Sequence, residues 1–305
     1  MIAFFVGKAR IFIAHQVHHR PMTAELTQQI QAFITAGLTE DVGEGDHTSL
    51  ACIPADKRDT ARLLVKDKGV LAGVAVARQI FETVDPNAEL IIHKQDGDTI
   101  REGDIAFQVT CNSQALLKAE RLVLNTMQRM SGIATMSRQY AQEVGDFPVR
   151  VLDTRKTTPL LRFLEKWAVR LGGCSNYRDG LYDWIMLKDN HIDACGGIRP
   201  AIERVQSYLK EKDLDLNITV EVRDLDELQQ VLDTGQVTRI MLDNFDSPTM
   251  KKAVDLIDGR FEVEASGGIT RERLREVAQT GVDFISVGAL THSVRSLDLS
   301  LKVSG

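Results

Sequence analysis

The chain of 305 residues has no run approaching the roughly 18 apolar residues that a membrane-spanning helix needs. Its start also lacks the basic segment and the small-residue cleavage site of a secretory signal peptide, because Lys8 and Arg10 interrupt the apolar stretch. We therefore expect neither a membrane span nor a signal peptide. Residues 1–21 are predicted to be a disordered extension.

An excess of positive charge is also missing. The chain has 37 Lys and Arg against 43 Asp and Glu, a net charge of -6 at pH 7. Nonspecific nucleic-acid binding depends on a basic face, so this class of protein is disfavoured. Hydrophobic residues make up 43% of the chain, which argues against intrinsic disorder. The composition indicates a globular protein that binds neither nucleic acid nor membrane.

The four cysteines form no CxxC pair. A zinc ribbon and a thioredoxin-like redox site are therefore disfavoured. Four cysteines in a chain of this length are more often small, buried apolar residues. We interpret Cys52, Cys111, Cys174 and Cys195 as free thiols in a reducing setting, and we predict a cytoplasmic protein.

The first half of the chain has a β-rich pattern framed by helices. Residues 23–43 carry apolar side chains at helical spacing and predict an amphipathic helix. Strand-like runs follow at 61–73 and 89–111, the second with two Gly-Asp turns. Residues 113–145 are typical of a long helical stretch, in which we expect Gly132 to separate two helices.

From residue 149 onward, six short apolar strands alternate with helical stretches, beginning near residues 149, 182, 218, 239, 261 and 283. This alternation predicts parallel strands connected by helices, which close most naturally into an α/β barrel. In the first connecting helix, Thr158 is the expected N-cap and Pro159 the first helical residue. Gly172 and Gly173 are expected to end it.

Nearly every one of these strands ends in polar residues or glycine. Active sites of α/β barrels form at the carboxyl ends of the strands, and the late loops often bind phosphate. Six such clusters in register therefore favour a binding site over solvent-exposed strand ends. The clusters are residues 153–156, 188–191, 221–223, 243–244, 266–268 and Gly288.

Basic residues are concentrated between positions 150 and 192. This segment holds eight Lys and Arg against five acids, a local charge of +3 (8 − 5). We interpret Arg162, Lys166 and Arg170 as residues of a solvated helix surface. The bases at strand ends or before the second strand are Arg155, Lys156, Arg178 and Lys188. Such a group would bind a ligand with several carboxylates or phosphates.

The other strand ends carry glycines and acids. Backbone N–H groups beside Ser266, Gly267, Gly268 and Gly288 could approach a phosphate without a Cβ in the way. Glu221 and Asp243 could bind sugar hydroxyls or Mg²⁺, or face a developing positive charge. A salt bridge to a neighbouring base is the alternative role for either acid.

Several runs resemble those of the quinolinate phosphoribosyltransferases, the decarboxylating nicotinate-nucleotide pyrophosphorylases. The most specific are DTRKTTP and KDNHI, and EASGGIT and DFISVGALTHS also match. The resemblance covers nearly everything after Met22. It implies an α/β fold with an N-terminal α/β sandwich and an incomplete, TIM-like α/β barrel. The implied division is residues 22–125 joined by the chain end 294–305 for the sandwich, and residues 126–293 for the barrel.

The resemblance also implies the activity, that of a pentosyltransferase in NAD biosynthesis. Quinolinate and phosphoribosyl pyrophosphate would give nicotinate mononucleotide, pyrophosphate and CO₂, with Mg²⁺ as cofactor and a homodimer or higher homo-oligomer as the working unit. The implied catalytic residues are Lys156, Lys188, Glu221 and Asp243, the two acids also being the candidate Mg²⁺ ligands, directly or through water. Substrates would be bound by Arg155, Lys156, Tyr177, Arg178, Lys188 and, from the neighbouring subunit, Arg121. The phosphate loops would be Ser266, Gly267, Gly268 and Gly288.

The sequence departs from the family pattern at two positions. Tyr177 stands where the family usually has histidine, and a tyrosine is neutral near pH 7. We expect Tyr177 still to line the carboxylate pocket. Leu160 stands where the family usually has glycine, and we interpret it as a packing difference at the start of a helix.

Three alternative functions stay open on the sequence. The same scaffold could transfer the phosphoribosyl group to another nitrogen base, with Tyr177 as the motivation. A barrel aldolase or decarboxylase could use Lys188 or Lys156 as a Schiff base. A phosphosugar sensor without activity is the third alternative, but it would not need both acids and all four strand-end bases.

Overall fold

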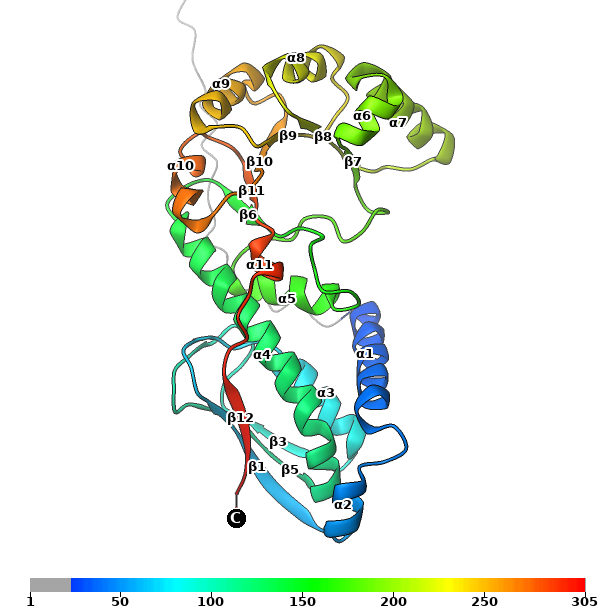
Figure 1. Ribbon diagram of the computed structural model, residues 1–305, viewed down its shortest axis with the longest axis vertical. Helices are drawn as coiled ribbons and strands as arrows, with labels where there is room; N and C mark the ends of the chain where they lie inside the picture. The colour runs from blue at the N-terminus through cyan, green and yellow to red at the C-terminus, as the bar shows by residue number, and fades with distance from the viewer. Residues whose placement is uncertain (1–22, 305) are drawn as a thin grey trace, which may run out of the picture.

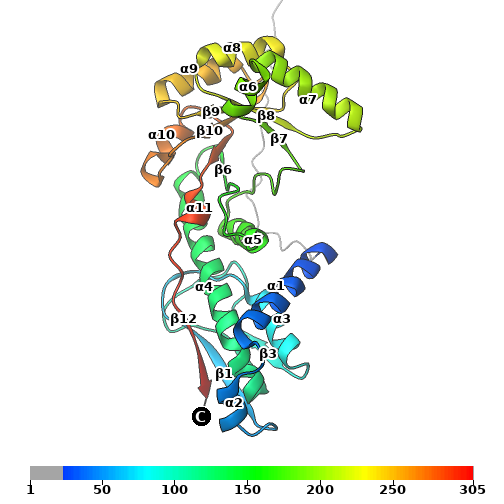
Figure 2. The same ribbon diagram turned by 45° about the vertical axis from the view of Figure 1, so that its right-hand side comes forward.

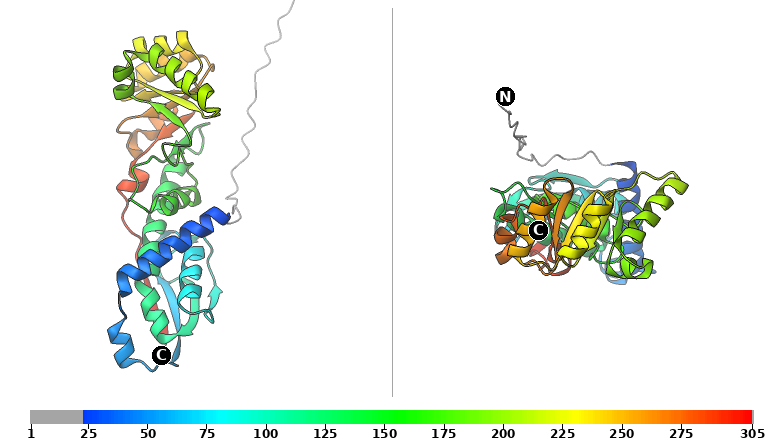
Figure 3. Two further views of the ribbon diagram at one scale, coloured as in Figure 1. Left: turned by 90° about the vertical axis from the view of Figure 1, so that its right-hand side faces the viewer. Right: turned by 90° about the horizontal axis from the view of Figure 1, so that it is seen from above.

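A computed structural model describes residues 23–304. Two parts follow one another along the long axis of the molecule, as Figure 1 shows, and Figure 2 and the left view of Figure 3 show the same elongated shape from other sides. The lower part holds the first strands and the end of the chain, and the upper part holds the later strands. The extension predicted at residues 1–21 lies outside the described residues.

The lower part is built on an antiparallel sheet with the strand order β12-β1-β5-β3. Ala61, Leu63 and Val65 alternate along β1 and are buried, as expected of a sheet with one face on the core. The pairing of β12 with β1 brings the chain end into this part, as predicted. The strands are β1 (Arg58–Val65), β3 (Glu89–Ile92), β5 (Ile105–Asn112) and β12 (Leu299–Ser304), and a two-stranded sheet joins β2 (Gly69–Val70) and β4 (Thr99–Ile100).

Four helices belong to this part, and α3 and α4 pack on each other. They are α1 (Ala24–Val42), α2 (His47–Cys52), α3 (Val74–Val84) and α4 (Ser113–Glu143). The predicted helix over residues 23–43 is confirmed, and the Thr23 side chain caps it by accepting a hydrogen bond from Leu26 N at 3.2 Å. The start of α3 is capped by Asp96, a residue of another loop, whose carboxylate accepts from Val74 N at 2.8 Å.

Helix α4 connects the two parts and corrects one prediction. It is one helix of 31 residues, so the break expected at Gly132 is wrong. A Cβ at Gly132 would lie 2.3 Å from the carbonyl oxygen of Arg295. Glycine is required there because the chain returning from the upper part crosses α4 at this point. The crossing is fixed by Gln128, which accepts from Leu297 N at 3.0 Å and donates to Leu299 O at 2.9 Å.

The upper part is an incomplete barrel of six parallel strands, and each strand lies where the sequence predicts it. The strand order is β6-β11-β10-β9-β8-β7, so β6 and β7 form the two edges of the sheet and leave one side of the barrel open. The strands are β6 (Arg150–Leu152), β7 (Ile185–Leu187), β8 (Ile218–Val222), β9 (Arg239–Asp243), β10 (Glu262–Ser266) and β11 (Phe284–Ser286).

Helices lie outside this sheet, as the views in Figures 1 and 3 show for α7, α8 and α9. The predicted fold class, an α/β sandwich followed by an incomplete α/β barrel, is confirmed. The division at residues 125 and 126 stays a prediction, since α4 runs through it. The helices are α5 (Arg162–Gly172), α6 (Asp189–Cys195), α7 (Ile198–Lys212), α8 (Leu225–Thr234), α9 (Ser247–Ile257), α10 (Leu274–Ala278), α11 (Ala289–His292) and the 3-10 turn η1 (Arg271–Arg273).

The start of α5 differs from the prediction, whereas its end agrees. The helix begins at Arg162, so the expected N-cap Thr158 and first residue Pro159 are wrong. Thr158 N donates instead to the buried carboxylate of Glu165 at 3.1 Å, which draws the preceding residues into a separate turn. At the other end Gly173 adopts φ 100 and caps the helix.

Leu160 lies in this turn with φ 65, in the left-handed region. Its side chain is 93% exposed, so the interpretation as a packing difference is wrong. The left-handed conformation costs a non-glycine residue about 1–2 kcal/mol, and asparagine tolerates it better than leucine. A family glycine at this position has the backbone freedom that leucine lacks.

Leu160→Asn is therefore expected to raise the free energy of unfolding by about 1 kcal/mol and the midpoint of thermal unfolding by about 2 °C. Leu181→Asn is the matched control, because Leu181 is 72% exposed and is not among the residues with positive φ. The control should change stability by less than about 0.5 kcal/mol. Equal midpoints for the two variants in calorimetry would contradict the role of backbone strain.

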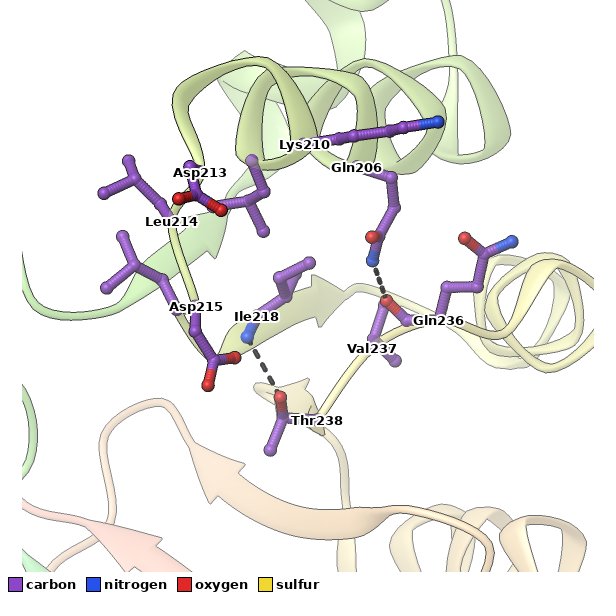
Figure 4. Close-up of a pocket in the computed structure, with 11 residues that line it drawn as sticks. Gln206, Lys210, Asp213, Leu214, Asp215, Ile218, Gln236, Val237 and Thr238 are labelled. Carbon is purple, nitrogen blue, oxygen red and sulfur yellow. Dashed lines mark hydrogen bonds between the residues drawn. The ribbon is translucent and has the colours of Figure 1, made fainter.

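A groove of about 480 Å³ opens at the amino ends of β8 and β9, next to the end of α7 (Figure 4). Hydrogen bonds hold its walls together, from Ile218 N to Thr238 Oγ1 at 3.1 Å and from Gln206 Nε2 to Gln236 O at 2.6 Å. Active sites of α/β barrels form at the opposite, carboxyl ends of the strands. The functional site is therefore expected at that other end.

Two further expectations concern the surroundings of the protein. Within residues 23–304, no helix combines the length and the apolar character that crossing a membrane requires. Cys52, Cys111, Cys174 and Cys195 are all free thiols. Cys111 and Cys174 are buried, as expected, whereas Cys52 is exposed and Cys195 is half-buried, so the expectation of burial is wrong for these two.

Candidate active site

The carboxyl ends of the barrel strands bring the loops after β6 and β11 together. A Cβ at Gly288, after β11, would lie 3.1 Å from Lys156 Cδ and 3.0 Å from His292 Nε2. The Thr291 hydroxyl also donates to Lys156 O at 2.8 Å. The predicted residues Lys156 and Gly288 are therefore neighbours, and His292 is a third member that the sequence reasoning missed.

Lys188, Glu221 and Asp243 follow or end three adjacent strands, β7, β8 and β9. Lys188 Nζ lies 3.8 Å from Glu221 Oε2, which is the salt bridge considered as the alternative role of this acid. Burial raises the pKa of Glu221; Lys188 opposes the rise, and the nearby Asp243 adds to it. The negative charge of Asp243 thus acts on Glu221, and a cation bound at these carboxylates would offset it.

The backbone of Lys188 is also fixed. Lys188 is the N-cap of α6, and its N–H donates to His191 Nδ1 at 3.1 Å. The histidine of the KDNHI motif therefore holds the base of the lysine side chain in place without contacting its ammonium group.

The Ser266–Gly268 turn is built on glycine for a steric reason. A Cβ at Gly267, which has φ 98, would lie 2.2 Å from Asn244 Oδ1 and 2.7 Å from Asn244 N. The same asparagine donates its N–H to Ser266 O at 2.9 Å and its side-chain amide to Asp243 Oδ2 at 2.7 Å. A Cβ at Gly268, which has φ 54, would have no atom of residues 23–304 within 4 Å, so the turn is open on that side.

Arg155 and Arg178 form the most unusual feature of the site. Arg178 is buried and donates to Trp184 O at 2.9 Å and to Met186 Sδ at 3.6 Å. Burial lowers its pKa, and the neighbouring charge of Arg155 lowers it further. Arg155 Nε is buried and has no hydrogen-bond partner within residues 23–304. An unsatisfied buried donor costs about 1–3 kcal/mol, which an anionic ligand would recover.

Tyr177 points toward the interior of the barrel. Its hydroxyl lies 2.7 Å from Thr219 Oγ1, which also accepts from Trp184 Nε1 at 2.8 Å. The Tyr177 and Trp184 rings meet edge to face with centroids 5.6 Å apart. Burial raises the pKa of Tyr177, so the side chain stays neutral at physiological pH. Its expected contact with substrate stays a prediction.

A buried ion pair lies among the inward-facing residues of β9 and β10 and was missed from the sequence. The Arg239 guanidinium is 2.9 Å from Glu264 and 2.8 Å from Glu262, and it lies 3.8 Å from the ring centroid of Phe284. Ser286 donates a further hydrogen bond to Glu264. The alternation of Glu262, Glu264 and Ser266 along one strand was the signal that could have found it.

Lys166 overturns another interpretation. It was expected on a solvated helix surface, but it is 1% exposed and its Nζ lies 2.5 Å from Asp153 Oδ1. Arg170 is exposed, as expected, and Arg162 is half-buried and donates to Thr157 Oγ1 and Asp179 O. The expectation for Lys166 is wrong because α5 buries this side chain at the end of β6, a contact that helical spacing does not reveal.

Arg121 is the one predicted residue that the fold leaves apart from this cluster. It is exposed in the first half of α4, alongside the lower part of the molecule, and forms no ion pair with any residue between 23 and 304. The same region contains no group of three or more His, Cys, Asp or Glu that could hold a metal ion.

Comparison with known proteins decides the family. The model of the N-terminal domain of quinolinate phosphoribosyl transferase matches residues 46–131, and that of the C-terminal domain matches residues 133–302. The chain belongs to the quinolinate phosphoribosyltransferase family. The resemblance drawn from the DTRKTTP and KDNHI motifs is thereby confirmed.

Individual members of the family are similar over most of their length. A nicotinate-nucleotide pyrophosphorylase of Arabidopsis thaliana, named as chloroplastic, is 46% identical over 91% of this chain and 83% of its own. A probable nicotinate-nucleotide pyrophosphorylase of Bacillus subtilis is 42% identical over 90% of this chain and 94% of its own. The crystal structure of NadC from Streptococcus pyogenes superposes with a TM-score of 0.85 and 37% identity, covering 91% of this chain and 98% of that one.

Proposed function

We propose that this quinolinate phosphoribosyltransferase works at the carboxyl ends of β6–β11. Quinolinate and phosphoribosyl pyrophosphate give nicotinate mononucleotide, pyrophosphate and CO₂, a decarboxylating pentosyl transfer in NAD biosynthesis. The observation that carries this assignment is the buried, unpartnered Nε of Arg155 next to the buried Arg178. Two guanidinium groups held together against their own repulsion suit a ligand with two carboxylates, which quinolinate has.

The sugar donor fits the opposite side of the same site. Lys156 and the backbone around Gly288 would bind one phosphate-bearing end, and the Ser266–Gly268 turn would bind the other. Loss of pyrophosphate leaves positive charge on the ribose ring. The carboxylate of Glu221 would stabilise this charge while Lys188, at 3.8 Å, keeps the carboxylate ionised.

Decarboxylation then follows from the charge of the product ring. Once its nitrogen is ribosylated, the cationic ring stabilises the electron pair that the departing CO₂ leaves on the ring carbon, and a proton from water then takes the place of the CO₂. This step needs positioning and little acid–base chemistry. The neutral Tyr177 and the arginines that bind the carboxylates would supply the positioning.

Glu221 and Asp243 are the residues that would hold Mg²⁺, directly or through water. Their mutual repulsion fits a shared cation, and Mg²⁺ in such sites usually takes one or two protein carboxylates together with substrate phosphates. This preference agrees with the lack of a larger ligand cluster within residues 23–304. Bound Mg²⁺ would neutralise charge on the leaving pyrophosphate.

The working unit we propose is a homodimer or a higher homo-oligomer. Arg121 is exposed and outside the cluster of its own chain, so it can complete a site only in another subunit. The exposed face of α4 that carries Arg121 also presents Leu117 and Asn125 at four-residue spacing, a stripe suited to contact with a second copy. We further propose a cytoplasmic location, on the cysteine argument above.

The test is an assay of the purified protein with quinolinate, phosphoribosyl pyrophosphate and Mg²⁺. Nicotinate mononucleotide and CO₂ are expected in equal amounts, and chelation of Mg²⁺ is expected to abolish both. Nicotinate, which lacks one carboxylate, serves as the control acceptor and should give less than about 1% of the rate, because it leaves one arginine without a partner.

Two outcomes would overturn the proposal. A folded protein that forms neither product lacks the activity, and one that prefers another nitrogen base has a different acceptor. Borohydride trapping with quinolinate distinguishes the phosphoribosyl transfer from a Schiff-base lyase with Lys188 as the nucleophile, since only the lyase mechanism leaves a reduced adduct on the protein.

A further inference from the structure

The free edge of β6, on the open side of the barrel, pairs with a segment that is not a strand. β6 and β7 are the two edges of the sheet, and Ser175 pairs in parallel with Leu152 on the free edge of β6. Ser175 N donates to Val151 O at 2.8 Å, and Asp153 N donates to Ser175 O at 3.1 Å. Ser175 therefore extends the edge of the sheet by one bridge, and Arg178 follows three residues later.

One buried carboxylate fastens this segment. Asp153, directly after β6, is 0% exposed, and its Oδ1 accepts from Lys166 Nζ at 2.5 Å and from Tyr177 N at 2.9 Å. Its Oδ2 accepts from the side-chain amide of Asn176. Lys166 extends the contact by donating to Tyr177 O at 3.3 Å. Strand β6, helix α5 and residues 175–178 thus meet at a single ion pair.

The two ligand-binding arginines lie next to this ion pair in the chain. Arg155 is two residues after Asp153, and Arg178 directly follows Tyr177, whose backbone both members of the pair hold. The charge of Arg155 opposes that of Arg178, and the buried Nε of Arg155 has no hydrogen-bond partner within residues 23–304. Holding them in place before the substrate arrives requires an anchor on each side.

We propose that Asp153 and Lys166 are positioning residues that hold Arg155 and Arg178 ready for the two carboxylates of the acceptor. The identity of this ligand rests on the function proposed above. Preorganisation of this kind raises the affinity for the ligand, because the entropy cost of ordering two flexible side chains is not paid on binding. A buried ion pair often adds little net stability to a protein. A contribution to stability alone therefore does not explain why this ion pair is present.

The test removes the charges of Asp153 and Lys166 together, so that an effect on substrate binding can be distinguished from an effect on stability. Asp153→Asn leaves a buried ammonium group without its anion and is expected to destabilise the protein. The double variant Asp153→Asn/Lys166→Met has no unpaired charge, and its thermal midpoint should lie within about 5 °C of wild type. Asp179→Asn is the matched control, since Asp179 lies 4.0 Å from the same lysine but is 63% exposed.

For the double variant, calorimetry should give a Kd for quinolinate about 10- to 100-fold higher than for wild type. In the assay, the KM for quinolinate should rise by the same factor as the Kd, whereas the KM for phosphoribosyl pyrophosphate should change by less than about threefold. Lys156, which lies on the loop after β6, is the one proposed contact of the second substrate near the ion pair, whereas its other proposed contacts lie at the ends of β8–β11. The control variant should match wild type in all three measurements.

Each outcome is decisive. A folded double variant with wild-type quinolinate affinity overturns the positioning role, as does an equal rise in both KM values. A wild-type protein that binds quinolinate without turning it over would refute the proposed function. The positioning role would then be decided by the Kd values of the wild-type protein and the double variant in calorimetry. A wild-type protein that binds no quinolinate would overturn both.

Discussion

Replacing Arg155 with methionine is expected to lower kcat/KM for quinolinate about 100- to 1000-fold while leaving the protein as stable as before or more stable. The loss follows from removing one of the two arginines proposed to bind the carboxylates of the substrate, a change that costs about 3–4 kcal/mol. The unchanged stability follows from the unliganded protein, in which Arg155 Nε has no partner within residues 23–304 and its charge repels Arg178. Removing an unsatisfied donor should therefore raise the unfolding free energy by about 1 kcal/mol.

Arg260→Met is the matched control for this pair of measurements. Arg260 lies before β10, at the end of the barrel away from the site, and donates to Ile257 O at 3.1 Å and to Leu256 O at 2.9 Å. Its replacement should lower stability slightly and leave the kinetics unchanged. If Arg155→Met lost stability as Arg260→Met does, or retained its kcat/KM, Arg155 would be a structural residue and the acceptor site would have to lie elsewhere.

Mixing Arg121→Ala with Lys188→Ala is expected to restore about one quarter of the wild-type activity, although each variant alone should lose at least about 99%. The reason is that each site would take Lys188 from one subunit and Arg121 from the other. Random exchange makes about half of the dimers hybrid, and each hybrid has one site with both residues intact and one with neither. The measurement is the rate of nicotinate mononucleotide formation after the subunits have been exchanged.

Two controls make the mixture informative. Each variant is taken through the same exchange alone, which should restore nothing, and wild type is taken through it to fix the scale. A mixture no more active than the mean of the two variants would show that Arg121 does not reach a neighbouring site. Hydrodynamic measurement of both variants excludes loss of the oligomer as the cause.

The positions of the barrel strands could be predicted from the sequence because each strand repeats a local pattern. A short apolar run followed by a polar or glycine cluster was enough to locate β6, β8 and β10 and, with them, Asp153, Glu221 and Ser266. The carboxyl ends of parallel strands meet at one edge of a sheet, so the convergence of these residues followed from their order alone. The family motifs identified the ligands as well.

Features that depend on contacts between distant residues could not be predicted in this way. Gly132 has the composition of a helix break, but it is the point where Arg295 crosses an unbroken α4. Leu160 had the pattern of a helix start, but Glu165 draws the preceding turn away and leaves Leu160 in a left-handed conformation. In the first case a partner far along the chain outweighs the local propensity, and in the second a buried carboxylate seven residues after Thr158 does so.

The sequence by itself determined the positions of the barrel strands along the chain, the α/β class and the family, and it supplied the candidate residues of the site. Only the tertiary structure decided that Lys166 is buried against Asp153 and that Arg155 and Arg178 are held as neighbours. The physical reason is that a charged residue in a sequence does not indicate whether its side chain is exposed to solvent or buried. A lysine on a helix has the same local pattern whether it faces water or a carboxylate, and packing alone distinguishes the two.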